Sequence, residues 1–450
     1  MDKTKVLREM NRILGYIENG DHLTKEQVAT IKQDTIDNYH DYFNTGYLDF
    51  RKSITPDGAT IEWVGSGENI IDIEGNKYID CIGGFGTYIG GHRNPEVVKY
   101  VEAQLSRLTL SSTELLEPLR GYLCEAIAMI TPGDLQYSYL TNGGAEAVEM
   151  AIKMAILYNG SGYFISTVNG FHGKSIGALS MTGKDVYREK YYPNLMQQVE
   201  HIEYGSADAL EQAIKNINAV GQHVTAFIVE PIQGEAGVVI PPEGYLKKAR
   251  EICTKYGVVM ICDEIQTGMG RTGRMWRCEE EGVVPDILIF GKAVSGGIVP
   301  ITGIVSRKEV FLGSGLADNP FILGSPTFGG NAIACSAFLG IIKYIVENDI
   351  PKLAAEKGEY FLKKLLEMQK KHKILESVRG AGLMIALEFK TSELGYEVSK
   401  GMFARYILVS GTLNNARVIR IEPPAIISYE SIDKTVAALD EAIGDVEAKM

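Results

Sequence analysis

Glycine-rich or polar residues directly follow four apolar segments of this sequence, and their types fit chemistry on a bound group. Lys292 comes two residues after the apolar segment 287–290. A lysine near the centre of a sheet is desolvated, so it loses its proton more readily and its amine can form a Schiff base with a carbonyl group. A surface lysine is the usual alternative. The following Ser295-Gly296-Gly297 argues against a surface helix and therefore favours the chemical role.

Two more apolar segments end in residues of other types. Asp263 follows segment 258–262 and could hold a protonated ring nitrogen, or it could cap the next turn. Gly143-Gly144-Ala145 follows segment 137–140 and opens a predicted helix. Backbone N–H groups at such a helix start can bind a phosphate, although a plain strand-to-helix turn would use the same residues.

An aromatic residue follows the fourth segment. Phe171 comes after segment 163–168 and could cover the face of a planar ligand, although a lone Phe171-His172 pair more often serves packing. Together the four positions provide a phosphate cradle, a ring-covering aromatic, an acid for a ring nitrogen and a nucleophilic lysine. Pyridoxal phosphate requires this combination, because it needs a lysine Schiff base and an acidic partner for its pyridinium.

One stretch matches a different cofactor pattern. Residues 268–273 fit the G-x-G-x-x-G string of dinucleotide-binding proteins. That pattern needs its glycines directly at a strand end and a helix that starts within them. Here residues 263–267 separate the predicted strand from the glycines, and 271–276 predict an irregular loop. A nicotinamide site is therefore not favoured.

The elements that must position these residues alternate between about residues 100 and 310. The strand candidates are 137–140, 163–168, 224–229, 258–262, 287–290 and 301–305. Helical stretches such as 145–158 and 245–256 lie between them. This alternation predicts parallel strand–helix–strand units and a doubly wound sheet. In such sheets ligands bind at the carboxyl ends of the strands, where the four positions lie.

The regions on either side predict further elements. Thr24 and Gln27 form a capping-box pattern for a helix to about residue 43, residues 70–80 predict a hairpin, and Pro95 is placed to open a helix. Beyond residue 331, helices at 332–346 and 354–368, strands at 383–389 and 418–421, a helix around 396–405 and a last helix near 432–446 predict a second domain.

We therefore predict three regions. Residues 1–70 form an N-terminal helical segment and the start of the hairpin, which pack with the small domain, residues 71–335 a large cofactor-binding domain, and residues 336–450 a smaller α/β domain.

Composition limits the classes of function. The 450 residues include 45 Lys and Arg against 57 Asp and Glu, a net charge of −12, which argues against nucleic acid as a partner. The six cysteines form no C-x-x-C pair, so neither a zinc site nor a disulfide framework is predicted. The longest uncharged stretch, 319–342, contains two prolines and two asparagines and does not predict a membrane span. The N-terminus lacks a signal core, so we expect a cytoplasmic protein with no membrane partner.

Longer motifs resemble a known family. The strings IVEPIQGEAGVVIPPEGYL, VVMICDEIQTGMGRTGR, PDILIFGKAVSGG and SPTFGGN, in that order, resemble the class III, fold type I aminotransferases over nearly the whole chain. Within this class NTGYLDFRKS, YIDCIGGFGTYIGGHRNP and GTLNNARVIRIEPP most resemble the diamine (putrescine) aminotransferases. The resemblance implies a large domain with a doubly wound, mostly parallel sheet, a smaller α/β C-terminal domain, and pyridoxal phosphate as cofactor.

The resemblance also implies roles for individual residues. Lys292 would hold the cofactor as a Schiff base and shuttle a proton, Asp263 would keep the ring nitrogen protonated, and Gln266 would bond the ring hydroxyl. Thr327 would reach the phosphate of the neighbouring subunit, which implies a homodimer with shared sites and leaves open whether dimers pair into tetramers. The full cofactor set is Gly143, Gly144, Ala145, Phe171, His172, Glu230, Asp263, Gln266, Lys292 and Thr327.

The implied reaction moves the terminal amine of putrescine to 2-oxoglutarate and gives 4-aminobutanal, which cyclises to 1-pyrroline, and glutamate. Glu235 and Arg420 resemble the switchable pair of this class: Arg420 binds the acceptor's carboxylate, and Glu235 neutralises Arg420 when a simple amine is bound. A third substrate-site residue is Lys174, where ornithine-type relatives carry arginine. Lysine lacks the bidentate fork, which disfavours α-amino-acid donors.

Several alternatives stay open. 4-Aminobutyrate, ornithine or acetylornithine, and cadaverine are other candidate donors, and an ω-amino acid:pyruvate enzyme is another candidate activity. A non-catalytic or nicotinamide-dependent relative would need no lysine at position 292. Relatives usually carry Ser-Gly-Thr where this chain has Gly143-Gly144-Ala145, so two hydroxyl contacts to the phosphate are missing.

Overall fold

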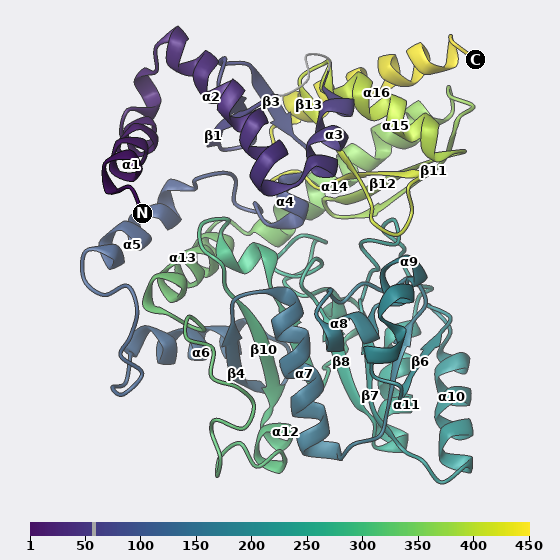
Figure 1. The fold of residues 1–450 in the computed structure, drawn as a ribbon. Coiled ribbons are helices and arrows are strands. Elements are labelled where there is room, and N and C mark those ends of the chain that lie inside the picture. The colour runs from purple at the N-terminus through teal and green to yellow at the C-terminus, as the bar shows by residue number, and fades with distance from the viewer. Residues whose placement is uncertain (56–59) are drawn as a thin grey trace. The chain divides into compact units, whose positions relative to one another are not determined.

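The computed structural model describes residues 1–55 and 60–450 (Figure 1). It divides into two compact units. The smaller consists of Met1–Gly65 with Ile70–Tyr78, and the larger of Ser66–Asn69 with Ile79–Met450. The predicted boundaries at residues 70 and 335 stay a prediction.

The smaller unit contains three helices and most of a hairpin. The helices are α1 (Lys3–Glu18), α2 (Lys25–Asn38) and α3 (Thr45–Ile54), with short turns at Gly20–His22 and Tyr39–Phe43. The predicted capping box is confirmed, because Thr24 Oγ1 accepts from the Gln27 N–H at 3.2 Å and Gln27 Oε1 accepts from the Thr24 N–H at 2.8 Å. The α-helix that was predicted to reach residue 43 ends at Asn38, and a π-helical turn at Tyr39–Phe43 follows it.

The strands of the N-terminal hairpin follow prediction. They are β2 (Asn69–Asp72) and β3 (Lys77–Asp80), after β1 (Glu62–Ser66). Asp72 Oδ1 accepts from the N–H groups of Glu74 and Asn76, which closes the turn around Gly75 at φ 90°. The last residues of β3, Ile79 and Asp80, belong to the larger unit and pair in parallel with β13 (Ile407–Leu408).

A seven-stranded, mostly parallel sheet forms the centre of the larger unit. Its order is β4-β10-β9-β8-β7-β5-β6. The bounds are β4 Leu135–Thr141, β5 Tyr163–Thr167, β6 Val199–Ile202, β7 Val224–Val229, β8 Val259–Asp263, β9 Ile287–Phe290 and β10 Thr302–Arg307. Strands β5 to β9 pair in parallel, and β10 runs antiparallel to β4 and β9. The doubly wound α/β prediction is confirmed; only edge strand β6, whose VEHI sequence lacks an apolar run, was missed.

The helices of this region, which include those before β4 and after β10, are α4 Gly83–Gly86, α5 Pro95–Leu105, α6 Pro118–Ile130, α7 Gly144–Asn159, α8 Ile176–Met181, α9 Asp185–Arg188, α10 Ala207–Ala219, α11 Tyr245–Tyr256 and α12 Lys308–Gly313. Helices α7, α8, α9, α10 and α11 lie between the strands of the sheet in the chain, and Figure 1 shows α7 across one face of the sheet. Short 3-10 turns lie at Glu189–Asn194, Arg277–Glu281 and Lys292–Ser295. Pro95 is the first residue of α5, as predicted.

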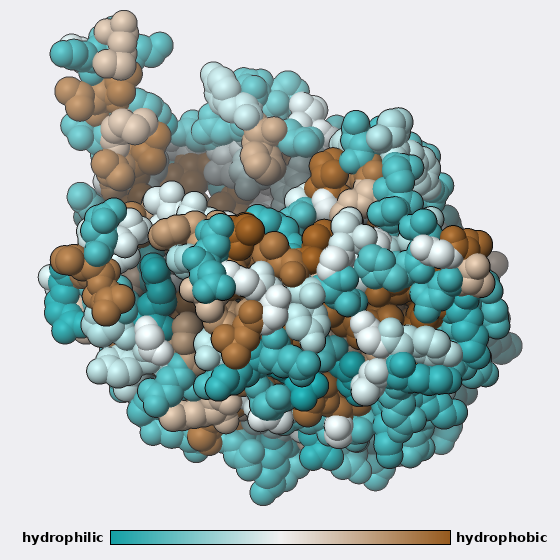
Figure 2. Space-filling model, turned by 90° about the horizontal axis from the view of Figure 1, so that it is seen from below, coloured by the Kyte–Doolittle hydropathy of each residue, from teal (hydrophilic) through white to brown (hydrophobic). Residues whose placement is uncertain are grey.

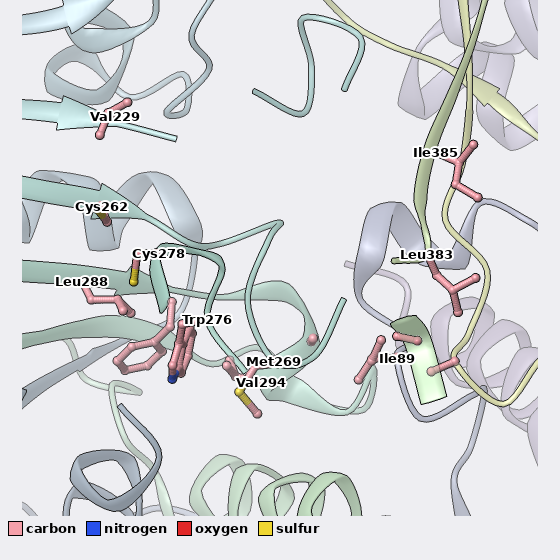
Figure 3. Close-up of a cluster of buried hydrophobic side chains, with 14 of the residues drawn as sticks. Ile89, Val229, Cys262, Met269, Trp276, Cys278, Leu288, Val294, Leu383 and Ile385 are labelled. Atoms are coloured by element: carbon pink, nitrogen blue, oxygen red, sulfur yellow. The ribbon is translucent and has the colours of Figure 1, made fainter. Parts of the chain in front are cut away.

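Both faces of the sheet are buried at its centre, which explains the apolar sequences of β8 and β9. On one face Ile261 and Ile289 pack with residues of α7. On the other, Cys262 and Leu288 belong to one cluster with Trp276 (Figure 3). Since successive strand residues point to opposite faces, β8 and β9 contribute to both clusters. Apolar side chains fill both faces of β8 and β9, and the charged residues Asp263 and Lys292 come at or just after the carboxyl ends of these strands.

The C-terminal part carries an antiparallel sheet of order β11-β12-β15-β14. Its elements are α13 Ala332–Glu347, α14 Ile350–Gln369, β11 Leu375–Ala381, β12 Met384–Phe389, α15 Ser392–Phe403, β14 Ser410–Gly411, β15 Val418–Ile421 and α16 Tyr429–Glu447. The predicted apolar face of the last helix is confirmed by the burial of Ile432, Leu439 and Ile443. Strand β11 was missed, because its LESVRGA sequence is polar along most of its length.

No helix within residues 1–55 and 60–450 has the length and apolar character that a membrane span requires. The predicted cytoplasmic location stays a prediction.

Candidate active site

A cavity of about 270 Å³ lies at the carboxyl ends of the central strands. It is lined by Gly144, Ala145, Phe171, His172, Gly173, Glu230, Ile232, Glu235, Asp263, Ile265, Gln266, Thr267 and Lys292. The start of α7 and the residues after β5, β7, β8 and β9 thus meet at one place. The structure brings together the four positions that the sequence singled out.

Asp263, the last residue of β8, has two partners. Its Oδ2 lies 2.7 Å from His172 Nδ1, and its Oδ1 accepts from the Ile265 N–H at 3.2 Å. The carboxylate therefore caps the next turn and also faces the cavity. Burial lowers the pKa of His172, but the hydrogen bond and charge of Asp263 outweigh burial and the pKa is raised. Within the described residues, His172 Nε2 is buried without a hydrogen-bond partner.

Glu230 follows β7 and is 6% exposed. It accepts from the Phe171 N–H at 2.9 Å and from the Gly234 N–H at 3.0 Å. Burial raises the pKa of Glu230 to about 7, although the charge of His172 and the two backbone donors oppose the rise. By holding the Phe171 backbone, Glu230 fixes the loop that carries this aromatic ring over the cavity.

Lys292 begins the 3-10 turn after β9 and lines the cavity. Its backbone is left-handed, with φ 48°, which is uncommon for a residue with a side chain. Such strain persists only where the surroundings impose it, and it is frequent at functional sites. The residue is half-buried, and its side chain borders the cavity.

The first turn of α7 offers backbone N–H groups to the cavity. Gly143 is the N-cap and supplies no side-chain cap. Glu146 Oε2 accepts from the Asn142 N–H at 2.9 Å, which lies before the helix. The N-terminal end of this 16-residue helix therefore keeps the donors and the positive dipole end that favour an anion.

Glu235 and Arg420 form an ion pair beside the cavity, with Glu235 Oε1 2.8 Å from Arg420 Nη1. Arg420 lies on β15, and its Nε is 3.5 Å from Glu422 Oε2. Burial raises the pKa of Glu235, but the charges of Arg420 and Lys292 outweigh burial and the pKa is lowered. Burial alone would lower the pKa of Arg420, but the charges of Glu422 and Glu235 outweigh burial and the pKa is raised. Both side chains are therefore charged.

The sequence reasoning missed two residues here. The Arg420 guanidinium lies 5.0 Å from the centre of the Phe85 ring. Gln266 Nε2 lies 3.4 Å from the Phe85 carbonyl oxygen and 3.3 Å from Glu422 Oε2. Glu422 could have been found, because it follows Arg420 by two positions, the spacing of residues on one side of an extended chain, just after the end of β15. Phe85 adopts φ 57° within a run of glycines, and nothing in that pattern predicts its contact with Arg420.

Four predicted residues lie outside the lining of the cavity, and one of them is Arg420, which pairs with the lining residue Glu235. Gly143 precedes the lining residue Gly144, and Thr327 is exposed. Lys174 is also exposed; its Nζ lies 5.9 Å from the Phe171 ring centre and 4.5 Å from that of Tyr187. The stretch 268–273 forms turns as predicted, and its Arg271 is fully buried, donating to the carbonyl oxygen of Leu383 at 3.2 Å.

Comparisons with known proteins agree with this geometry. The family model described as aminotransferase class-III matches residues 62–443. The chain is 42% identical over 439 residues to the putrescine aminotransferase of Pectobacterium atrosepticum, covering 96% of this chain and 93% of that protein. The crystal structure of the ornithine aminotransferase from Toxoplasma gondii ME49 matches with a TM-score of 0.84 and 30% identity, covering 96% of this chain and 98% of that one.

A further solved structure, an (S)-enantioselective omega-transaminase from Thermomicrobium roseum, matches with a TM-score of 0.84 and 28% identity, covering 93% of this chain and 98% of that chain. The fold and the cavity define a pyridoxal-phosphate-dependent enzyme of fold type I. The chain belongs to the class III aminotransferases. It is an aminotransferase that uses pyridoxal phosphate and moves an amino group from an amine donor to a keto acid acceptor.

The residues in the cavity fit this cofactor. The start of α7 offers phosphate donors, and Lys292 supplies an amine. Asp263, held by His172, supplies a carboxylate for the ring nitrogen, and the orphaned His172 Nε2 leaves a polar atom without a partner among the described residues. All lie around one cavity, so the donor set matches a phosphate, a carbonyl and a pyridine nitrogen.

The glycine at the start of α7 yields a prediction. Gly143 has an extended backbone (φ −140°, ψ 149°), and a Cβ built on it meets nothing within 4 Å. Gly143→Ser should therefore add a hydroxyl at the phosphate cradle without a collision. We expect the dissociation constant for pyridoxal phosphate to fall about three- to tenfold, the net effect of one ordinary hydrogen bond at a solvated helix start. Fluorescence titration of the cofactor-depleted enzyme measures it.

Gly143→Ala is the matched control, because it adds the Cβ without the hydroxyl. Its affinity should equal that of the unaltered enzyme. Equal tightening by serine and alanine would show that the backbone, and not the hydroxyl, limits phosphate binding.

Proposed function

We propose that this aminotransferase takes the terminal amino group of a diamine, putrescine in the first place, and passes it to 2-oxoglutarate. The products are 4-aminobutanal and glutamate. The aldehyde cyclises to 1-pyrroline, because its remaining amine reaches it intramolecularly. The 42% identity to a putrescine aminotransferase over 96% of the chain carries this proposal, and the buried Glu235–Arg420 pair supports it.

Residues around the cavity would hold the cofactor in the following way. Lys292 Nζ binds it covalently, the first N–H groups of α7 bind its phosphate, and Phe171 covers its ring. Asp263 keeps the pyridine nitrogen protonated, and His172 orients that carboxylate through the 2.7 Å contact. The bound cofactor supplies an electron-withdrawing ring for the reaction. Lys292 Nζ, once released, removes the proton from the donor carbon that carries the amine and returns a proton to the acceptor carbon.

The orientation of Gln266 supports its assignment to the ring hydroxyl. Its Nε2 faces two groups that only accept, the Phe85 carbonyl and the Glu422 carboxylate, so its Oε1 is the free acceptor side of the amide. A Cβ on Gly234 would lie 1.5 Å from Gln266 Oε1. Any side chain at position 234 would therefore collide with Gln266 Oε1 in its present position.

The Glu235–Arg420 pair would let one site serve two unlike substrates. Putrescine carries no carboxylate, so Arg420 stays neutralised by Glu235 while the donor is bound. A carboxylate of 2-oxoglutarate replaces Glu235 as the partner of Arg420, whose fork suits a carboxylate. Lys174 is exposed and has no such fork, which disfavours ornithine as donor.

We also propose a homodimer in which each subunit completes the other's site. Thr327 is exposed and outside the cavity lining, so its hydroxyl is available to a second subunit. Its neighbours Phe321 and Phe328 are 75% and 59% exposed. Hydrophobic residues gather in patches on one face of the molecule (Figure 2). Exposed apolar side chains of this kind are typical of subunit interfaces.

The role of Lys292 can be tested directly. Lys292→Ala should lower turnover at least about a thousandfold, since both covalent binding and proton transfer are lost. Borohydride reduction of the holoenzyme followed by peptide mapping should mark Lys292. The exposed Lys190→Ala variant serves as control and should keep full activity. A label on a different lysine would refute the assignment.

The role of Arg420 separates the two substrates. Arg420→Lys keeps the charge that Glu235 and Glu422 need but loses the fork. We expect the KM for 2-oxoglutarate to rise about ten- to a hundredfold and that for putrescine to change little, because only the acceptor offers a carboxylate. Steady-state kinetics on both substrates measures this.

The same assay with a donor panel tests the diamine assignment. Putrescine should exceed cadaverine, 4-aminobutyrate, ornithine and acetylornithine as donor, and 2-oxoglutarate should exceed pyruvate as acceptor. Equal damage to both substrates in Arg420→Lys, or ornithine outperforming putrescine, would contradict the proposal.

Shared sites predict complementation. Lys292→Ala and Thr327→Ala subunits, each impaired alone, should regain activity when mixed, up to about one active site in four after random exchange. One mixed site then combines an intact lysine with an intact threonine. Activity assays with subunit exchange followed by native mass spectrometry decide it. Exchange without recovery would show that each subunit works alone.

A further inference from the structure

Glu235 has a second partner that comes from the loop 412–415, which joins β14 to β15. Its Oε1 binds Arg420 Nη1, and its Oε2 accepts from the Leu413 N–H at 2.9 Å. The Glu235 carbonyl oxygen also accepts from the Asn414 N–H at 2.9 Å. The two oxygens of one carboxylate are thus divided between a side chain and a backbone donor.

The loop 412–415 is itself held by residues of the large sheet region. The Tyr187 hydroxyl donates to the Leu413 carbonyl at 2.9 Å, and Asn414 Nδ2 donates to the Asn169 carbonyl at 2.7 Å. Burial and the charge of Glu235 raise the pKa of Tyr187, so its hydroxyl stays protonated and can donate. These two contacts keep the Leu413 N–H aimed at Glu235.

The backbone donor matters when Arg420 changes partner. Glu235 is 6% exposed, and a buried carboxylate without a partner is strongly unfavourable. In the donor-bound state Arg420 neutralises it. When the carboxylate of the acceptor takes Arg420, the Leu413 N–H is the hydrogen bond that Glu235 keeps.

We infer that the loop 412–415 is a positioning element of the substrate switch, in which the Leu413 N–H stabilises charged Glu235 while Arg420 binds the acceptor's carboxylate. This inference rests on the proposed roles of Glu235 and Arg420. Loosening the loop leaves Glu235 dependent on Arg420 alone. An acceptor must then displace a stronger ion pair, whereas a donor without a carboxylate meets an unchanged site.

Two variants loosen the loop without touching the ion pair. Asn414→Ala removes the contact to the Asn169 carbonyl, and Tyr187→Phe removes only the hydroxyl that holds Leu413. In each holoenzyme variant we expect the KM for 2-oxoglutarate to rise about three- to tenfold and the KM for putrescine to stay within about twofold. The exposed residues Asn194 and Tyr191 provide matched controls as Asn194→Ala and Tyr191→Phe, which should change neither KM.

Binding of glutarate, a dicarboxylate without the keto group, gives a readout that needs no turnover. Calorimetry on the holoenzymes should show the same three- to tenfold loss of glutarate affinity in both loop variants. This holds whichever amine is the natural donor. Failure of putrescine as a substrate would therefore refute the proposed donor and leave this measurement intact.

A double-mutant cycle shows whether the loop acts through Glu235. In a Glu235→Ala background, Asn414→Ala should no longer change glutarate affinity, because the carboxylate that the loop stabilises is gone. The inference is overturned if the loss persists in that background, or if the loop variants weaken donor and acceptor equally.

Discussion

Charged side chains buried beside the cavity must each have a partner, and this requirement organises the whole region. Glu235 and Arg420 are 6% and 2% exposed. Each carries a charge that would be very unfavourable alone at this depth. Strand β15 and the loop after β7 must therefore lie where their charges meet. Such ion pairs add little stability compared with apolar packing. Removing one partner of a pair, however, leaves the other charge buried without a partner, which is strongly destabilising.

The same requirement makes the site responsive to its ligands. In the proposed function, a substrate carboxylate enters when Arg420 releases Glu235, and Glu235 must then keep another partner. Asp263 shows the opposite arrangement, because His172 and the Ile265 N–H occupy both of its oxygens and hold it in one place. The proposal thus assigns the fixed carboxylate to the cofactor and the carboxylate with two exchangeable partners to the substrates.

The central sheet explains why these polar groups gather where they do. Strands β8 and β9 are buried on both faces and are almost wholly apolar. Their charged residues, Asp263 and Lys292, come at or just after the carboxyl ends, and the carboxyl ends of parallel strands share one edge. The strain at Lys292, with φ 48°, lies at that edge, where the turn after β9 directs the lysine to the cavity.

Much of this could be predicted from the sequence by itself. The alternation of apolar strands and helices, the lysine after segment 287–290, Asp263 and the glycines before α7 are local patterns, and local patterns depend on neighbours in the chain. Glu235 and Arg420 were assigned by resemblance, since they lie 185 residues apart. Only the tertiary structure decided that Phe85 and Glu422 contact Arg420 and Gln266, and that the Leu413 N–H reaches Glu235. Every residue except proline has a backbone N–H, so the residue type at position 413 does not reveal the contact with Glu235. The contacts of Phe85 and Glu422 depend on which strand ends and loops meet, and the order of strands in the sheet decides that.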